Sequence, residues 1–338
     1  MGLGIIEFSK RIGVSTATVS RAFSGRGRIS EKTQKRVLLE ARRLGFTPNV
    51  HASRLNSKRT GQIGLCYGLS DDTIFDYYNM ELAQEIAKVA ESKNLTVNLE
   101  LSSRGAKGNE RLGRLSRGAG LDGIILVVEG RANGVGLLQS IEGCPVVVVT
   151  NRSWKRIGEE TVIELDLMSG IAEAVRDLVA KGHERIGFIG GVEITGKRKK
   201  FQRVLLENSL EVDDRWIVED AVSFSDGQKA LGKIAGQGPT AVFCTTDVLA
   251  MGALNEAHLR GMAVPGDLSI VGMDNLAFTA YTTPSLSTIG IPRERIAVAA
   301  VESLEAKFKG EGSPPTGFAA RQVIGSYYVP RASVGSLR

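Results

Sequence analysis

From residue 61 onward, short apolar runs alternate with longer stretches in which apolar residues recur every three or four positions. The short runs are rich in Val and Ile, which predicts strands buried on both faces, and the longer stretches predict amphipathic helices. One such helix is expected to begin at Asp166 and end at Gly182. Seven strands are expected: QIGLCYG (62–68), LTVNLEL (95–101), DGIILVV (122–128), PVVVVT (145–150), RIGFIGG (185–191), TAVFCTT (240–246) and LSIVGMD (268–274).

This alternation predicts an α/β fold in which parallel sheets are covered by helices on both faces. The chain is long enough for two such sheets, one in each of two lobes. It is expected to cross between the lobes near residues 150–162 and to return near residues 290 and 317. Because open α/β sheets bind ligands beyond the carboxyl ends of their strands, a binding site is expected between the lobes.

The first 45 residues contain three short helical patterns. The first, IIEFSKRI, places Ile5, Phe8 and Ile12 on one face, and Gly13 then lets the backbone leave the helix. The third starts at the N-cap residue Ser30 and stops at Gly45. Its expected inward face consists of Val37, Leu38, Ala41 and Leu44, and its expected outward face of Lys32, Lys35, Arg36 and Arg42. Three short helices with a Gly turn between the first two predict a helix-turn-helix.

The second helical pattern, TATVSRAF, carries the expected DNA-reading face. Ser15 is a suitable N-cap, and Val19 and Phe23 are expected to point inward. Its outward residues near the start are small: Thr16, Ala17 and Thr18. Such residues let a helix approach base edges closely, and Arg21 is long enough to reach guanine or phosphate.

The charge of the chain is unevenly distributed. Residues 1–61 contain 13 basic and 3 acidic residues, a balance of +10. The remaining 277 residues contain 30 basic and 34 acidic residues, a balance of −4. A basic head on a slightly acidic body is typical of a nucleic-acid-binding module joined to another domain.

Composition excludes several classes of protein. No run approaches the roughly 18 apolar residues that span a bilayer, and no signal peptide is recognisable, so a cytoplasmic location is expected. Cys66, Cys144 and Cys244 are widely spaced, which favours small core residues over a disulfide or a metal site. The three histidines, His51, His183 and His258, are far apart, and a positive charge at the last two would suit a helix C-terminus. No metal and no cofactor are expected.

The motifs GVSTATVSR, GRGRISEKTQKRV and RRLGFTPN resemble the head of the LacI/GalR family of transcription regulators. The resemblance implies that the following segment is a hinge that becomes helical on operator DNA, in which Leu55 wedges a base step open and Ala52 lets two hinges touch. Arg54 is displaced by one position from the usual Ala-Arg-x-Leu pattern. Pattern and resemblance together give ten expected DNA-binding residues: Ser15, Thr16, Ala17, Thr18, Arg21, Arg28, Asn49, Ala52, Arg54 and Leu55.

The resemblance extends over the body through LDGIIL, KGHERIGFIGG, PTAVFCTTDVLAMGAL, GMAVPGDLSIVGMDN and TPSLSTI. It implies a two-lobed domain like a periplasmic binding protein. The expected divisions are a helix-turn-helix domain (1–48), a hinge (49–60), lobe one (61–160 and 291–316) and lobe two (161–290 and 317–338).

The same resemblance implies an effector site built from Asn151, Arg152, Lys197, Arg198, Thr246 and Asp274. Asp274 follows a strand and could accept hydrogen bonds from the hydroxyl groups of a sugar or a nucleoside. Asp247 also follows a strand, but an N-cap for the next helix is the favoured interpretation.

The sequence argues against two other classes of protein. A solute-binding protein of a transport system would share the two-lobed body but would need an export signal and no basic head. A two-lobed enzyme would need a nucleophile–base pair or paired carboxylates, which the sequence does not show, and GFIGG lacks the full dinucleotide-binding pattern. The sequence therefore predicts a non-enzymatic homodimeric regulator, a repressor that binds a pseudo-palindromic operator under the control of a small sugar, polyol or nucleoside.

Overall fold

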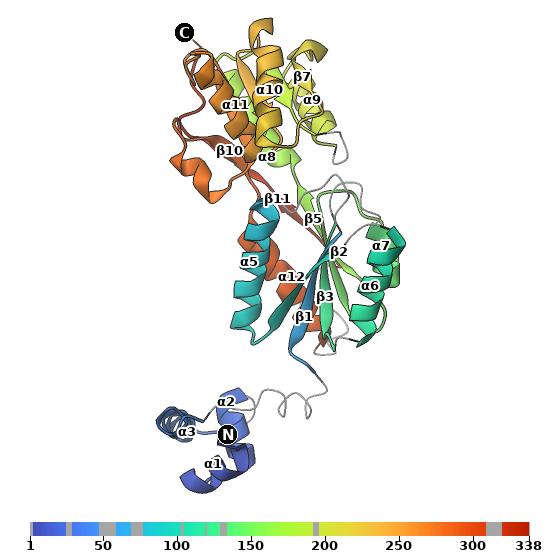
Figure 1. Ribbon diagram of the computed structural model, residues 1–338, viewed down its shortest axis with the longest axis vertical. Helices are drawn as coiled ribbons and strands as arrows, with labels where there is room; N and C mark the ends of the chain where they lie inside the picture. The colour runs from blue at the N-terminus through green and yellow to red at the C-terminus, as the bar shows by residue number, and fades with distance from the viewer. Residues whose placement is uncertain are drawn as a thin grey trace. The chain divides into compact units, whose positions relative to one another are not determined.

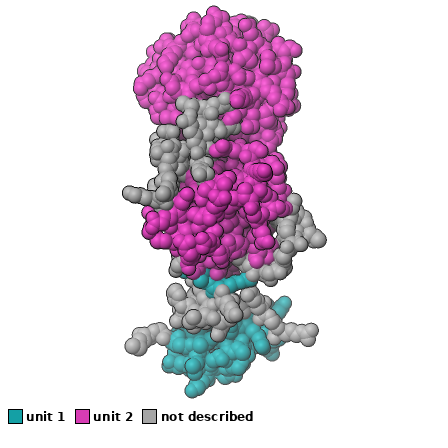
Figure 2. Space-filling model, turned by 90° about the vertical axis from the view of Figure 1, so that its right-hand side faces the viewer, with its two compact units in different colours: residues 1–62 teal, residues 63–338 magenta. Residues whose placement is uncertain are grey.

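A computed structural model describes residues 3–24, 29–46, 59–68, 77–102, 105–118, 120–128, 134–191, 196–308 and 320–337. The chain forms two compact units, residues 1–62 and residues 63–338 (Figures 1 and 2). The first unit contains the three helices that the pattern predicts: α1 (Ile5–Ile12), α2 (Thr16–Ser24) and α3 (Glu31–Leu44).

In the described part of the second unit, the strands form two six-stranded sheets. The first sheet has the order β11-β5-β4-β3-β1-β2, and the second has the order β12-β10-β9-β8-β6-β7. The strands of the first sheet are β1 (Gln62–Gly68), β2 (Thr96–Ser102), β3 (Gly123–Val128), β4 (Val146–Thr150), β5 (Thr161–Asp166) and β11 (Arg321–Gly325). Those of the second are β6 (Ile186–Ile189), β7 (Ile217–Val218), β8 (Ala241–Cys244), β9 (Ser269–Asp274), β10 (Ser287–Gly290) and β12 (Tyr327–Val329).

Both sheets are predominantly parallel, which confirms the predicted fold class. In the first sheet, β11, β5, β4, β3 and β1 pair in parallel. In the second, only the β10–β12 pair among the recorded pairings is antiparallel. Every one of the seven expected strands overlaps an observed strand. Strand β5 was not expected: the sequence placed the crossover between the lobes near residues 150–162, whereas the first sheet continues through β5 to Asp166.

Helices cover both faces of each sheet. In the first, α5 (Tyr77–Ser92) and α12 (Arg293–Phe308) lie on one face, and α6 (Gly105–Gly118) and α7 (Gly134–Ser140) lie on the other (Figure 1). In the second, α8 (Met168–Ala180) and α9 (Lys197–Glu207) oppose α10 (Phe224–Ile234) and α11 (Asp247–Leu259). Since helices flank both sides, all six residues of β3 and of β9 are buried.

The chain passes between the two sheets three times, at short connections. It passes from β5 to α8, from β10 to α12, and from β11 to β12, in each case leaving a strand of one sheet at its carboxyl end. The carboxyl edges of the two sheets therefore face each other across the connections. The division of the lobes differs from the expected one, because residues 161–166 and 321–325 belong to the first sheet rather than to lobe two.

Two glycines allow α10 and α11 to pack unusually closely. A Cβ at Gly252 would lie 2.1 Å from the carbonyl oxygen of Phe224, and one at Gly227 would lie 2.3 Å from that of Leu249. Real Cβ atoms do not approach backbone this closely, so each helix needs Gly at the contact. The helix pair closes the outer face of the second sheet over a core that includes Leu231, Ile270 and Leu286.

Candidate nucleic-acid interface and effector site

The head has a small core of its own. Its buried residues are Phe8, Val19, Ala22, Val37, Ala41 and Phe46. The rings of Phe8 and Phe46 stack with centroids 4.1 Å apart. Gly13 and Gly45 adopt left-handed backbone conformations, with φ of 67° and 62°, and end α1 and α3 in Schellman-type turns. The turn at Gly45 brings Phe46 back into the core, since the Phe46 N–H donates to the carbonyl of Ala41 at 2.9 Å.

The start of α2 is fixed by Ser15. Its Oγ accepts a hydrogen bond from the backbone N–H of Thr18 at 3.1 Å and lies 2.9 Å from the Thr18 hydroxyl. Thr18 is half-buried, so this predicted DNA-binding residue also serves the cap. Thr16, Ala17 and Arg21 are exposed, as expected for residues that face DNA.

Ser20 is an exposed residue of α2 that the sequence reasoning missed. It lies four positions after Thr16 and one before Arg21, on the same side of the helix. The signal was available, because burial of Val19 and Ala22 at helical spacing leaves position 20 outside. Five predicted DNA-binding residues lie outside the described residues: Arg28, Asn49, Ala52, Arg54 and Leu55.

The basic side chains of α1, α2 and α3 are exposed. Within the described part of the head, some pair with neighbouring acids: Arg11 with Glu7, Arg43 with Glu40, and Lys35 with Glu31. Others in that part form no ion pair: Lys10, Arg21, Lys32 and Arg42. Such cations are available to phosphate groups of DNA.

In the second unit, three of the predicted effector residues lie at or just beyond the carboxyl ends of strands, and a fourth begins a helix. Asn151 directly follows β4, and its Oδ1 is buried with no hydrogen-bond partner among the described residues. Lys197 begins α9 beyond β6, and its Nζ donates to the carbonyl of Thr245 at 2.9 Å. Thr246 follows β8, and Asp274 ends β9. The facing carboxyl edges of the sheets thus bring these positions to one region of the unit.

Arg152 and Arg198 lie in different surroundings. Arg152 is exposed, one residue beyond Asn151. The Arg198 guanidinium is bound by two carboxylates, Glu219 and Asp214, the latter at 2.9 Å. These ion pairs join α9 to the segment before and after β7, which is a structural task.

Asp274 lies in an uncommon backbone conformation. Its φ is 115°, and that of the next residue, Asn275, is 52°. Positive φ in residues other than Gly costs free energy and persists where the surroundings enforce it. Here Arg331 donates to the Asn275 Oδ1 at 2.7 Å, and Thr288 Oγ1 accepts from the Asn275 N–H at 3.3 Å. The Asp274 side chain is nearly buried.

The favoured interpretation of Asp247 was wrong. The N-cap of α11 is Thr246, whose hydroxyl accepts from the Leu249 N–H at 3.2 Å. Asp247 is fully buried, and its carboxylate accepts from the Leu276 N–H at 2.8 Å and from the Thr288 hydroxyl at 2.5 Å. It therefore joins α11 to β10 and to the turn after β9, below Asp274.

Replacing Asp247 with Asn is expected to remove a pH-dependent part of the stability. Burial raises the pKa of the Asp247 carboxyl from 3.8 to about 7, against the opposing hydrogen bonds from Thr288 and Leu276. A raised pKa adds stability that is complete below pH 4 and is lost as the pH rises to 7, at up to about 1.4 kcal/mol per pH unit. The difference in unfolding free energy between wild type and Asp247→Asn, from urea titrations, should fall across this range and stay constant above it. A constant difference from pH 4 to 7 would contradict the raised pKa.

His183 does not serve a helix dipole as a cation, which corrects the expectation from sequence. Its ring is buried, with Nδ1 3.0 Å from the Thr240 hydroxyl and Nε2 3.0 Å from the carbonyl of Gly335. Burial lowers the pKa of this imidazole. The neutral ring ties the C-terminal segment to the second sheet.

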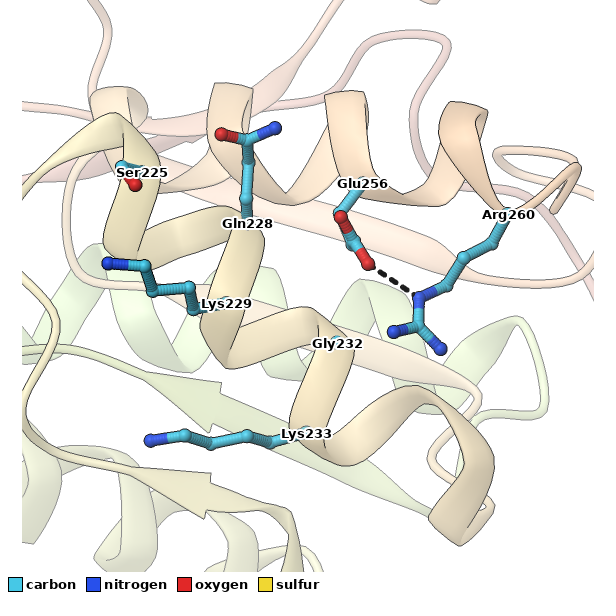
Figure 3. Close-up of a pocket in the computed structure, with 7 residues that line it drawn as sticks. All are labelled: Ser225, Gln228, Lys229, Gly232, Lys233, Glu256 and Arg260. Carbon is cyan, nitrogen blue, oxygen red and sulfur yellow. Dashed lines mark hydrogen bonds and ion pairs between the residues drawn. The ribbon is translucent and has the colours of Figure 1, made fainter.

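A shallow hollow of about 580 Å³ lies between α10 and α11 (Figure 3). Its lining residues are Ser225, Gln228, Lys229, Gly232, Lys233, Glu256 and Arg260. Glu256 and Arg260 pair across 2.6 Å, and Lys233 pairs with Asp220 at 3.6 Å. These pairs satisfy much of the charge in the hollow.

Among the described residues, no group of three or more His, Cys, Asp or Glu side chains is placed to hold a metal ion. No helix of that part of the chain is long and apolar enough to cross a membrane.

Comparisons with known proteins identify both units. Residues 6–49 match the model of bacterial regulatory proteins of the lacI family, and residues 175–334 match a periplasmic binding protein-like domain. The chain is 31% identical over 296 residues to the HTH-type transcriptional regulator DegA of Bacillus subtilis, covering 85% of this chain and 86% of DegA. It is 30% identical to catabolite control protein A of Priestia megaterium, covering 90% of this chain and 92% of that protein.

Solved structures share the fold. The lac repressor dimer bound to operator and an anti-inducer matches with a TM-score of 0.74 and 19% identity, over 99% of this chain and 100% of that chain. The complex of the regulator CelR with cellobiose matches with a TM-score of 0.70 and 22% identity, over 97% and 99% of the two chains.

The protein is thus a helix-turn-helix regulator with a two-lobed sensor domain. It belongs to the lacI family of bacterial regulatory proteins, and it regulates transcription by binding DNA. The match at residues 6–49 also decides between a regulator and a solute-binding protein of a transport system. The name of DegA likewise describes a transcription regulator.

Proposed function

We propose that the protein is a repressor that binds a pseudo-palindromic operator as a homodimer, and that it catalyses no reaction. The observation that carries the DNA-reading part is the division of α2, in which Val19 and Ala22 are buried while Thr16, Ala17 and Arg21 are exposed. These three side chains face the major groove, and basic residues of α3 hold phosphates. Leu55 opens a base step at the centre of the operator.

Relatives support this assignment. The transcriptional repressor PurR of Pectobacterium atrosepticum is 30% identical to this chain, and the match covers 89% of each protein. The lac repressor is a dimer on its operator in the structure that matches this chain.

A small polyhydroxylated molecule controls DNA binding in this proposal. It is held at the carboxyl edges of the two sheets by Asn151, Arg152, Lys197, Thr246 and Asp274. The buried, unpartnered Oδ1 of Asn151 supports a ligand at this place. Related structures hold cellobiose and ribose, at 22% and 21% identity. We leave Arg198 out of the site, because Glu219 and Asp214 bind its guanidinium.

Asp274→Asn is expected to weaken effector binding by about 10- to 100-fold, because a charge-assisted hydrogen bond to a hydroxyl group is lost. Asn tolerates the positive φ at this position, so the fold should persist. The measurement is a thermal-shift screen of sugars, polyols and nucleosides, in which a ligand at 100 times its Kd stabilises by about 2.7 kcal/mol.

The matched control is Asp220→Asn, which removes an exposed carboxylate of the second lobe. It should leave the shift intact. A ligand that shifts wild type and Asp274→Asn equally would remove Asp274 from the site.

A further inference from the structure

Arg293 occupies a junction between the two sheets. It is the first residue of α12, directly after the connection from β10. Its Nη1 donates to the carbonyl of Asp274 at 2.6 Å, and its Nη2 donates to the carbonyl of Asn275 at 2.9 Å. The same Nη2 lies 2.8 Å from a carboxylate oxygen of Glu81 on α5. One guanidinium thus binds the turn after β9 in the second sheet and a helix of the first.

These contacts bear directly on the strained turn. Successive carbonyls at positions 274 and 275 are bound by the two ends of one planar, rigid group, which fixes the peptide between them. The φ of 115° at Asp274 needs such external restraint. Arg331 restrains the same turn through the Asn275 side chain. Arg293 adds a restraint from α12, a helix that packs on the first sheet, whereas the turn itself belongs to the second sheet.

Glu81 makes a second contact across the junction. Its Oε1 accepts from the backbone N–H of Ala277 at 3.2 Å. Beside it, the ring of Tyr77 meets the ring of Phe278 edge-on, with centroids 5.7 Å apart. The side chains of Arg293 and Glu81 are only 14% and 27% exposed, so their attraction is weakly screened by solvent. The first turn of α5 therefore rests against the segment that follows Asp274.

We propose that Arg293 is a positioning residue, which holds the Asp274 turn in its effector-binding conformation and, through Glu81, couples that turn to the arrangement of the two lobes. The proposal rests on the function proposed above. A ligand that moves Asp274 also moves the carbonyl groups of Asp274 and Asn275, which are hydrogen-bonded to Arg293. The guanidinium transmits this movement to Glu81 on α5. Only a differential contact of this kind allows a ligand to shift the population of lobe arrangements.

The test uses the full-length protein without effector. Arg293→Lys keeps the charge but cannot bind two carbonyls and a carboxylate in one plane, and Glu81→Gln keeps the shape but removes the charge. Both variants are expected to exchange the backbone amide hydrogens of residues 274–277 for deuterium about ten-fold or more faster than wild type. Both are also expected to change operator affinity by about five-fold or more. In the double variant, the fold-changes in exchange rate and in operator affinity should be smaller than the products of those in the single variants. The reason is that both substitutions break the same contact between Arg293 and Glu81.

Arg295→Lys, an exposed residue of the same helix, is the matched control and should change neither quantity. A purely structural role would lower the melting temperature without a selective effect at residues 274–277 or on operator affinity. If Arg293→Lys does not fold, Glu81→Gln alone decides. Unchanged exchange and affinity in Glu81→Gln would overturn the proposal and leave the effector site standing. Effector binding that survives Asp274→Asn would instead overturn the proposed effector site and leave the exchange result valid.

Discussion

Raising the salt concentration from about 50 to about 200 mM is expected to weaken operator binding by about 10³- to 10⁵-fold. The reason is the charge distribution, since residues 1–61 carry a balance of +10 and the rest of the chain carries −4. A dimer that neutralises roughly 6–10 phosphates releases their counterions, and added salt opposes this release. Fluorescence anisotropy with a labelled operator duplex, selected from random DNA, measures the affinity at each salt concentration. A slope of log affinity against log salt near zero would contradict the proposed interface.

Single substitutions in the same titration separate base reading from phosphate binding. Arg21→Ala should weaken binding by about 10- to 100-fold if Arg21 reads a base, with the slope unchanged. Lys32→Ala is the matched control, because it removes one phosphate contact from each protomer. It should lower the magnitude of the slope by about 1 per protomer and weaken binding to all sequences alike. Leu55→Ala should lower operator affinity without changing the slope, because Leu carries no charge. A reduced slope for Leu55→Ala would argue against a purely apolar wedge.

Gly252→Ala is expected to destabilise the second unit by about 2 kcal/mol or more. A methyl group there would lie 2.1 Å from the carbonyl oxygen of Phe224, so α10 and α11 must separate. Overpacking costs about 1–3 kcal/mol and sometimes more, and a contact of 2.1 Å with backbone lies at or above the upper end of that range. The gain of about 1 kcal/mol for Ala over Gly in a helix offsets only part of this cost. The melting temperature should fall by about 5 °C or more. Differential scanning calorimetry of the full-length protein measures it.

Gly236→Ala provides the control for this substitution. Position 236 lies just after α10, and a Cβ there meets nothing within 4 Å. This variant should match wild type or be slightly more stable. If Gly252→Ala and Gly236→Ala have the same melting temperature, the close contact of α10 with α11 is not what stabilises the unit.

The sequence predicts well wherever a local pattern decides the outcome. In the head, the spacing of Phe8, Val19 and Val37 and the glycines at 13 and 45 were sufficient, because helix faces and left-handed turns depend on near neighbours. The seven predicted strands are Val- and Ile-rich runs, for which a buried parallel sheet is the natural environment. In the part of the chain that the structure describes, five strands were not predicted, such as β5 and β7; they are short, interrupted by charge, or lack a continuous apolar run.

Side-chain roles depended on partners distant in sequence. His183 and Gly335 are separated by 152 positions, and Asp247 and Thr288 by 41, so no local pattern could reveal their bonds. An Asp after a strand suggests a cap, and only the tertiary position of Leu276 and Thr288 gave Asp247 a different task. Arg293 and Glu81 carried no motif at all.

By itself, the sequence determined the helix-turn-helix head, its excess of positive charge and the two-sheet α/β body. These follow from periodicity, capping and composition, which act over a few residues or over the whole chain. The tertiary structure alone decided which sheet holds residues 161–166, which group caps α11 and which arginine holds the Asp274 turn. Those outcomes depend on long-range packing, because buried polar groups bind whichever partner the fold brings within hydrogen-bond distance.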